Sequence, residues 1–265
     1  KCKDVIVNRE NYKNNTNTTN SRKVYSYKPV DFIIEFPGKL TDSEFKQLIT
    51  NAKQSGKRFT IIPLIFRWSC AYKFTGHANI LIFDFENNVV ERFEPYGYIS
   101  AFSKEEQTVS DGFNKKFKKF MKSHLGMIFK DQTELLKKGP QYIEENQIKG
   151  DKLVIKKTDP EGFCGAWSLW YADLKLSNPD KPSHELLTKA LFVIQKGKPH
   201  KLREFIRNYS TYLVKERYQF LKKIKQKNPY NYHMKEQLLS LEQKKTTIDG
   251  LLKTTKILES SFTIR

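Results

Sequence analysis

Residues 78–93 read ANILIFDFENNVVERF, and this stretch decides the fold. Apolar residues dominate its first half and return at Val89, Val90 and Phe93, and the Asn87-Asn88 pair between them is typical of a tight turn. We therefore expect a hairpin of two antiparallel strands that are mostly buried. A third apolar and β-rich stretch at 58–68 predicts a further strand, so that the sheet is mainly antiparallel.

Helical periodicity surrounds this predicted sheet. The expected helices cover residues 41–56, 104–124, 164–176, 184–195, 201–227 and 232–258. The fold class that follows is α+β, with a sheet packed on the helix that begins near Cys164. We expect three parts: a polar arm or loop at 1–30, a core at 31–200 and a basic helical extension at 201–265.

The chain is strongly basic, with 48 Lys and Arg residues against 29 Asp and Glu residues in 265 positions, a formal charge of +19. Residues 181–265 hold 19 of the basic residues and only 7 acidic ones. Such an excess attracts polyanions: a nucleic acid, an anionic membrane surface or an acidic protein face. It equally serves solubility alone, and no arginine-rich or RNA-binding motif accompanies the lysines.

The three cysteines, Cys2, Cys70 and Cys164, are too few for a disulfide scaffold and lack the spacing of a zinc site. We expect reduced thiols, and hence a reducing compartment, the host cytoplasm or nucleus, or a virion assembled there. No apolar run is long enough to span a membrane. No cofactor is expected, because nucleotide-binding glycine motifs are absent.

Cys164 is the candidate nucleophile, because it lies where a turn gives way to a predicted helix and the helix dipole favours its anion. His77 is the candidate general base and acid. Glu94 follows the neighbouring strand, and a hairpin would bring it to the histidine as its orienting carboxylate. Asn79, two residues from His77, shares its strand face, and the Gly165 N–H could help to bind an oxyanion.

The motifs Gly76-His77, Phe93-Glu94-Pro95 and Phe163-Cys164-Gly165 resemble the CE clan of cysteine peptidases. This clan contains the SUMO and ubiquitin-like protein proteases and the adenovirus maturation protease. The wider signature, including RFEPYG at 92–97 and FCGAWS at 163–168, looks like members encoded by large DNA viruses. The resemblance covers about residues 58–176 and implies a papain-like core.

The resemblance also implies a glutamine that donates to the oxyanion, and Gln141 in Gly139-Pro140-Gln141 is the candidate. The position where the clan usually has that glutamine holds Thr158, and Ala78 stands where the clan often has tryptophan. The walls near Trp167 would form a narrow channel for the substrate tail.

Together these features predict a thiol protease that cleaves peptide or isopeptide bonds. The expected substrate is a ubiquitin-like modifier or a viral structural protein, and acyl transfer is a third outcome within the clan. The alternative is a catalytically retired, basic scaffold that binds nucleic acid or a capsid.

Overall fold

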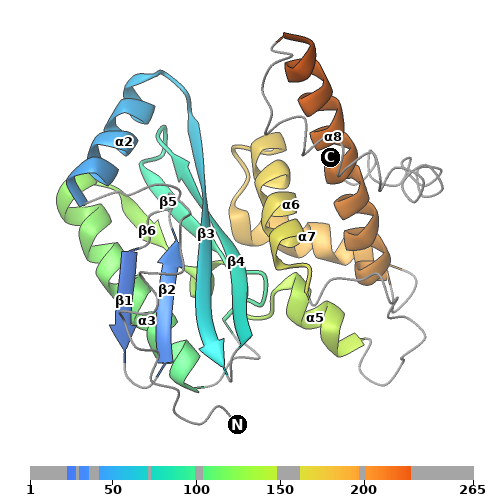
Figure 1. The fold of residues 1–265 in the computed structure, drawn as a ribbon, viewed down its shortest axis with the longest axis horizontal. Helices are drawn as coiled ribbons and strands as arrows, with labels where there is room; N and C mark the ends of the chain where they lie inside the picture. The colour runs from blue at the N-terminus through green and yellow to red at the C-terminus, as the bar shows by residue number, and fades with distance from the viewer. Residues whose placement is uncertain are drawn as a thin grey trace.

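The computed structural model describes residues 23–27, 30–35, 42–70, 73–98, 104–147, 162–196 and 201–227. Within them, six strands form one sheet in the order β1-β2-β3-β4-β5-β6, and helices cover both of its faces (Figure 1). Neighbouring strands are antiparallel except β5 and β6, which are parallel. The strands are β1 (Lys23–Tyr27), β2 (Val30–Glu35), β3 (Phe59–Cys70), β4 (Lys73–Asp84), β5 (Val89–Phe93) and β6 (Ile128–Lys130). The fold is therefore α+β with a mixed sheet.

The predicted hairpin is confirmed: β4 and β5 pair with Ile80 opposite Phe93 and Asp84 opposite Val89. Asn88 in the turn has a φ of 52°, a left-handed conformation that asparagine adopts more readily than most residues. Strand β4 begins at Lys73 rather than at residue 78, because its first half pairs with β3 along a polar stretch.

Alternate residues of β4 enter two separate cores, which explains why this strand is apolar on both faces. Ile80 and Ile82 belong to one core with Trp167. Leu81 and Phe83 belong to the other. Burial of both faces makes this strand the centre of a three-layer structure.

Helices α2 (Asp42–Gln54) and α3 (Lys104–Phe120) cover the second core, and a short π-helix, η1 (Met121–Leu125), continues α3. Phe113 and Phe117 turn inward from α3, while the lysines between and after them are exposed. Two short helices, α4 (Gln132–Leu135) and α5 (Pro140–Gln147), follow β6. The sequence indicated only a turn at Gly139-Pro140, so α4, α5 and β6 were not predicted.

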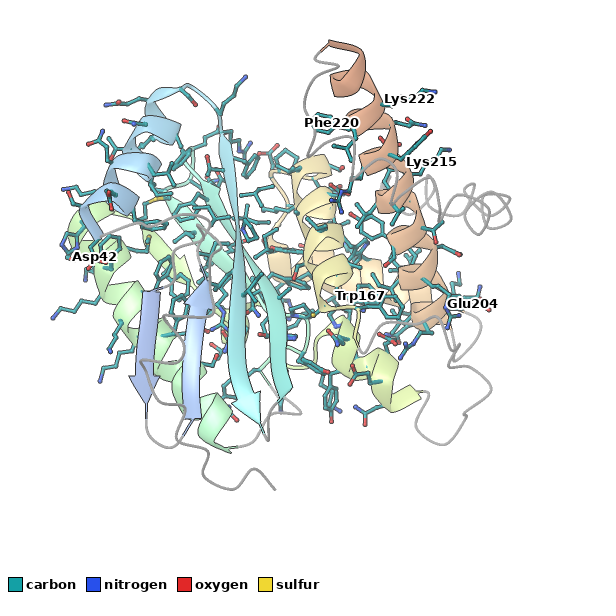
Figure 2. All side chains as sticks on the ribbon, viewed as in Figure 1. Asp42, Trp167, Glu204, Lys215, Phe220 and Lys222 are labelled. Atoms are coloured by element: carbon teal, nitrogen blue, oxygen red, sulfur yellow. The ribbon has the colours of Figure 1, made fainter. Side chains whose placement is uncertain are left out.

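Helices α6 (Cys164–Ser177), α7 (Ser183–Gln195) and α8 (Lys201–Lys227) cover the other face. The first half of α8 contributes Leu202, Phe205, Ile206 and Tyr209 to the same core as Trp167. Figure 2 shows Trp167 between α6 and α8, whereas Lys215, Lys222 and Glu204 lie on the outer side of α8.

Two of the predicted domain boundaries differ from the structure. The boundary at residue 201 is wrong, because the first turns of α8 are part of the main core and not an extension. The polar segment at 1–30 includes β1, which pairs with β2. The predicted helix at 232–258 lies outside the described residues, as does the remainder of the polar segment before Lys23.

Candidate functional site

The structure brings His77, Glu94 and Cys164 together at one end of the β4–β5 hairpin. His77 lies within β4, Glu94 directly follows β5, and Cys164 is the first residue of α6. His77 and Glu94 are 4% and 5% exposed, and Cys164 is partly exposed. A hairpin and a helix N-terminus thus place three residues from distant parts of the chain in contact. His77 lies inside β4, whereas the apolar stretch that predicted this strand begins only at residue 78.

Nε2 of His77 pairs with Oε1 of Glu94. Burial alone would lower the pKa of His77, but the charge of Glu94 and the hydrogen bond to Cys164 raise it to about 9. The pKa of Glu94 lies below its ordinary value: burial opposes ionisation, and the nearby charge of His77 outweighs burial. At neutral pH the pair is therefore an imidazolium and a carboxylate.

The thiol of Cys164 completes this charged group. Burial disfavours its anion, but the hydrogen bond and the charge of His77 lower its pKa, with help from the backbone N–H groups of Ala78 and Gly165. A thiolate is the form of cysteine that reacts with electrophiles. The arrangement can therefore hold a nucleophilic sulfur in a partly buried position.

Arg92, to which the sequence analysis assigned no role, supports Glu94 from within β5. Its guanidinium donates to Oδ1 of Asn79 at 2.9 Å, to Oδ1 of Asn114 at 2.7 Å and to Oε2 of Glu94 at 3.5 Å. Burial lowers the pKa of Arg92 to about 10, and the group stays charged at neutral pH. Asn79 thus supports Glu94 indirectly, by accepting a hydrogen bond from Arg92. Strand alternation was the available signal, since Arg92 and Glu94 are two residues apart.

Tyr96 forms one wall beside His77, with the two ring centroids 5.1 Å apart. Its backbone N–H donates to Oε1 of Glu94 at 3.1 Å, and its hydroxyl donates to the carboxylate of Glu145 at 2.8 Å. Burial and the Glu145 carboxylate raise the pKa of Tyr96 far above its usual range. The tyrosine is therefore a neutral, fixed neighbour of the histidine.

Gln141 lies at the start of α5, and its amide is close to Gly162: a Cβ on that glycine would come within 2.8 Å of Nε2 of Gln141. The backbone N–H of Gln141 donates to Pro95 at 3.0 Å. Its Nε2 donates to the Tyr96 hydroxyl at 3.2 Å and to Glu145 at 2.9 Å. Both amide hydrogens are thus already used, and neither is left to donate to an oxyanion.

The other two predicted supporting residues have structural positions. Trp167 is fully buried, donates to Glu144 at 3.3 Å and packs on Trp170 and Phe205, so it is a core residue and not a channel wall. A Cβ on Gly165 would meet only the Cβ of Ala78 at 4.0 Å, an ordinary contact. Close backbone approach does not require glycine there.

Comparison with known proteins gives one informative match. A protein of Acanthamoeba polyphaga mimivirus, described as a "putative ankyrin repeat protein", is 31% identical over 205 residues. The match covers 75% of this chain, which spans only a quarter of that protein's length. No protein-family model matches the chain, and no solved structure matches it.

These findings correct the identification made from the motifs. The similar protein is named for ankyrin repeats and not as a CE-clan cysteine protease. The assignments as a hydrolase, a thiol protease and a ubiquitin-like protein protease are therefore wrong. The resemblance rested on three short motifs, and short motifs specify local geometry more strongly than they specify a family. The papain-like architecture stays a prediction.

Two further observations concern membrane-spanning helices and metal-binding groups. No helix in the described part of the chain is long and apolar enough to cross a membrane. Within that same part, no group of three or more His, Cys, Asp or Glu residues is arranged to hold a metal ion.

Proposed function

We propose that this chain is a non-catalytic, protein-binding part of a scaffold protein, and that it binds an acidic partner through the outer face of α3 and η1. The observation that carries the proposal is a stripe of four exposed lysines, Lys115, Lys118, Lys119 and Lys122. We call it the lysine stripe. Its spacing of three and four residues places all four side chains on one side of the helix.

The lysine stripe is held in place by the opposite side of the same helix. Phe113 and Phe117 are 7% exposed, and Phe117 packs edge-on against Phe129 of β6 with ring centroids 5.1 Å apart. The stripe is therefore fixed to the sheet and spans about 10 Å along the helix axis. A rigid row of charges is a better docking surface than the same lysines on a free segment, because less conformational entropy is lost on binding.

The lysine stripe costs the isolated chain some stability. None of its four lysines forms an ion pair with another described residue. Like charges three and four residues apart destabilise a helix by about 0.2–0.5 kcal/mol per pair. An acidic partner would relieve this repulsion, so binding and helix stability are coupled.

Two observations favour an acidic protein over a nucleic acid. The similar mimivirus protein is named for ankyrin repeats, and such repeat proteins present extended surfaces for binding. The stripe also consists of lysine, whereas arginine is the usual residue for phosphate recognition. We further propose that the protein acts in the interior of the host cell or in a virion.

A binding experiment with a matched control tests the proposal. Poly-L-glutamate is titrated into wild type and into the variant with Lys115, Lys118, Lys119 and Lys122 changed to Gln. The control variant carries the same change at four scattered exposed lysines: Lys46, Lys57, Lys196 and Lys201. Four exposed ion pairs at about 0.5 kcal/mol each predict binding that is roughly thirtyfold weaker in the stripe variant.

The control variant should bind nearly as well as wild type. Equal loss in both variants would show that net charge alone is responsible and would contradict the proposal. Tighter binding of duplex DNA than of poly-L-glutamate would replace the acidic protein with a nucleic acid. Hydrolysis of fluorogenic ubiquitin or SUMO tails, lost on Cys164→Ser, would overturn the non-catalytic role.

A further inference from the structure

A cavity lies at the opposite end of the β4–β5 hairpin from Cys164. Its volume is about 390 Å³, within the range of small-molecule sites. The β4–β5 hairpin and the connection between α6 and α7 line it from two sides, and Lys130 of β6 and Glu134 and Leu135 of α4 complete the lining. Asp84, Glu91, Lys175, Asp180 and Ser183 line it.

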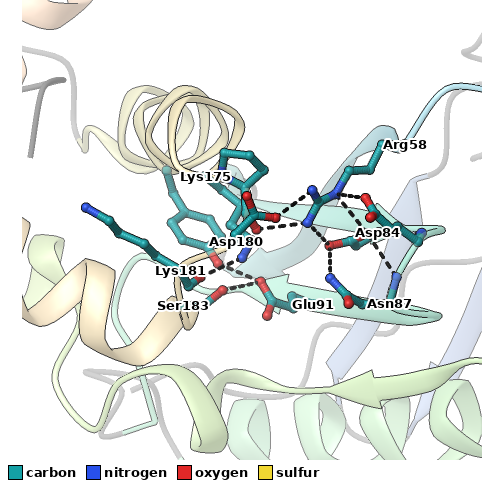
Figure 3. A network of polar contacts seen from close by, with 11 residues as sticks. Arg58, Asp84, Asn87, Glu91, Lys175, Asp180, Lys181 and Ser183 are labelled. Atoms are coloured by element: carbon teal, nitrogen blue, oxygen red, sulfur yellow. Dashed lines mark hydrogen bonds and ion pairs between the residues drawn. The ribbon is translucent and has the colours of Figure 1, made fainter.

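Two of the acidic groups at this cavity, Asp84 and Asp180, pair with Arg58. Its guanidinium pairs with Asp180 at 2.7 Å and with Asp84 at 3.4 Å, and it also contacts Glu86 at 3.0 Å. The pKa of Asp84 lies below its usual value: burial opposes ionisation, and hydrogen bonds from Asn87 and Arg58 outweigh it. This cluster, seen on the right of Figure 3, ties the hairpin turn to the segment after α6, and its one cation faces three carboxylates.

Glu91 is different, because it is 6% exposed and has no cationic partner among the described residues. The Tyr171 hydroxyl donates to it at 2.8 Å and the Ser183 hydroxyl at 2.7 Å, both to Oε2. No described residue donates to Oε1. A buried carboxylate normally has a charged partner or a full set of hydrogen bonds. Glu91 therefore offers one unused acceptor to the cavity.

Lys175, which also lines this cavity, has unused hydrogen-bond donors where Glu91 has an unused acceptor. It is also 6% exposed, and its Nζ donates to the backbone carbonyl of Lys181 at 2.9 Å. An ammonium group has three hydrogens, and no described carboxylate lies within 4.0 Å of this one. Lys175 therefore offers two unused donors.

The unused acceptor and the unused donors belong to residues that line the same cavity. Lys175 donates to Lys181, and Glu91 accepts from Ser183, two residues further along the chain. Even so, Glu91 and Lys175 form no ion pair with each other. Both line the same cavity, so a ligand with two opposite charges would compensate both at once.

We propose that this cavity binds a small zwitterion, a free α-amino acid, with its ammonium group on Oε1 of Glu91 and its carboxylate on Nζ of Lys175. The volume admits a molecule of that size. The site is separate from the lysine stripe and from Cys164, so it adds a small-molecule ligand to the proposed protein-binding role.

The test uses the full chain and the standard α-amino acids, added one at a time. Saturation-transfer NMR identifies those that bind, and isothermal titration gives the dissociation constant of the strongest. We expect at least one to bind, and its N-acetylated and C-amidated forms not to bind. Lys175→Met and Glu91→Gln should each weaken binding at least about tenfold, whereas Lys189→Met, an exposed helical lysine, should not.

Glu91→Gln retains an oxygen acceptor for Tyr171 and Ser183, so it is the variant most certain to fold, and circular dichroism checks each protein. If Lys175→Met does not fold, Glu91→Gln alone decides. Absence of binding by every amino acid, equal binding of the blocked forms, or unchanged binding in folded Glu91→Gln would each overturn the proposal.

Discussion

Glu94→Gln tests whether the charges at the hairpin end create the reactive thiolate. The substitution keeps the shape of the side chain and removes its negative charge. Glu94 is the largest of the influences that raise the pKa of His77, while burial acts in the opposite direction. Without the carboxylate, burial dominates and the pKa of His77 should fall towards or below its ordinary value.

The magnitude follows from the pKa of His77. It lies at about 9 against an ordinary value of 6.5. Each pKa unit corresponds to about 1.4 kcal/mol, so the protein favours the imidazolium by about 3 kcal/mol over the solvated ring. When most of this stabilisation of the imidazolium is lost, His77 is neutral at pH 7 and Cys164 has no cationic neighbour. The thiol should then be mainly protonated at neutral pH, and its alkylation at least about tenfold slower.

Two assays measure these effects. NMR titration of the His77 ring nitrogens gives its pKa, and iodoacetamide labelling followed by peptide mass spectrometry gives the rate at Cys164 separately from Cys70. Glu185→Gln, on the exposed side of α7, is the control and should change neither quantity. An unchanged His77 pKa in Glu94→Gln, or equal alkylation rates at Cys164 in the variant and wild type, would show that the charge of Glu94 does not create the thiolate.

Two further predictions concern stability. The raised pKa of His77 stabilises the fold below pH 6.5, and this contribution is lost as the pH rises to about 9. The lowered pKa of Cys164 contributes stability that is present above pH 9 and is lost as the pH falls through the lowered pKa, so its slope opposes that of His77. Chemical denaturation should therefore show a weaker decline of stability with rising pH in wild type than in Cys164→Ser; equal slopes would contradict the coupling. Phe205→Ala should lower the free energy of unfolding by about 3–5 kcal/mol, because the ring packs on Trp167 in the core. Phe220 is 62% exposed, so Phe220→Ala should change the free energy of unfolding by less than about 0.5 kcal/mol. Equal effects of the two phenylalanine substitutions would show that α8 is an extension after all.

The sequence alone predicted those strands and helices whose hydrophobic pattern or turn residues are distinctive. The Asn87-Asn88 turn and the apolar run around Ile82 specified the hairpin, and α8 matched its predicted range of 201–227. Strand β6 was missed because three residues are too few to show a hydrophobic alternation. Its parallel pairing with β5 also depends on the packing of α3, which the local sequence does not reveal. The predicted boundary at residue 201 differs from the structure for a related reason. The apolar stripe of α8 indicates that the helix packs on other elements, but it does not identify those elements as the main core.

The contact of His77 with Glu94 was predictable because it depends only on hairpin geometry. The roles of Arg92 and Tyr96 were not, because they depend on helices and loops that converge from elsewhere in the chain. Trp167 was misassigned because an aromatic residue near a candidate nucleophile serves equally well as core. The inference from local motifs to a protease family was wrong, since the same motifs occur in a chain that resembles part of a protein named for ankyrin repeats.

The lysine stripe on α3 and η1 is proposed as the binding surface for an acidic protein partner. Its most direct test is an amide NMR map of the ¹⁵N-labelled chain during titration with poly-L-glutamate. We expect shift changes concentrated at residues 115–122, which disappear when the four stripe lysines are changed to Gln. Changes spread evenly over exposed lysines on all elements, or confined to the surroundings of His77 and Cys164, would contradict it.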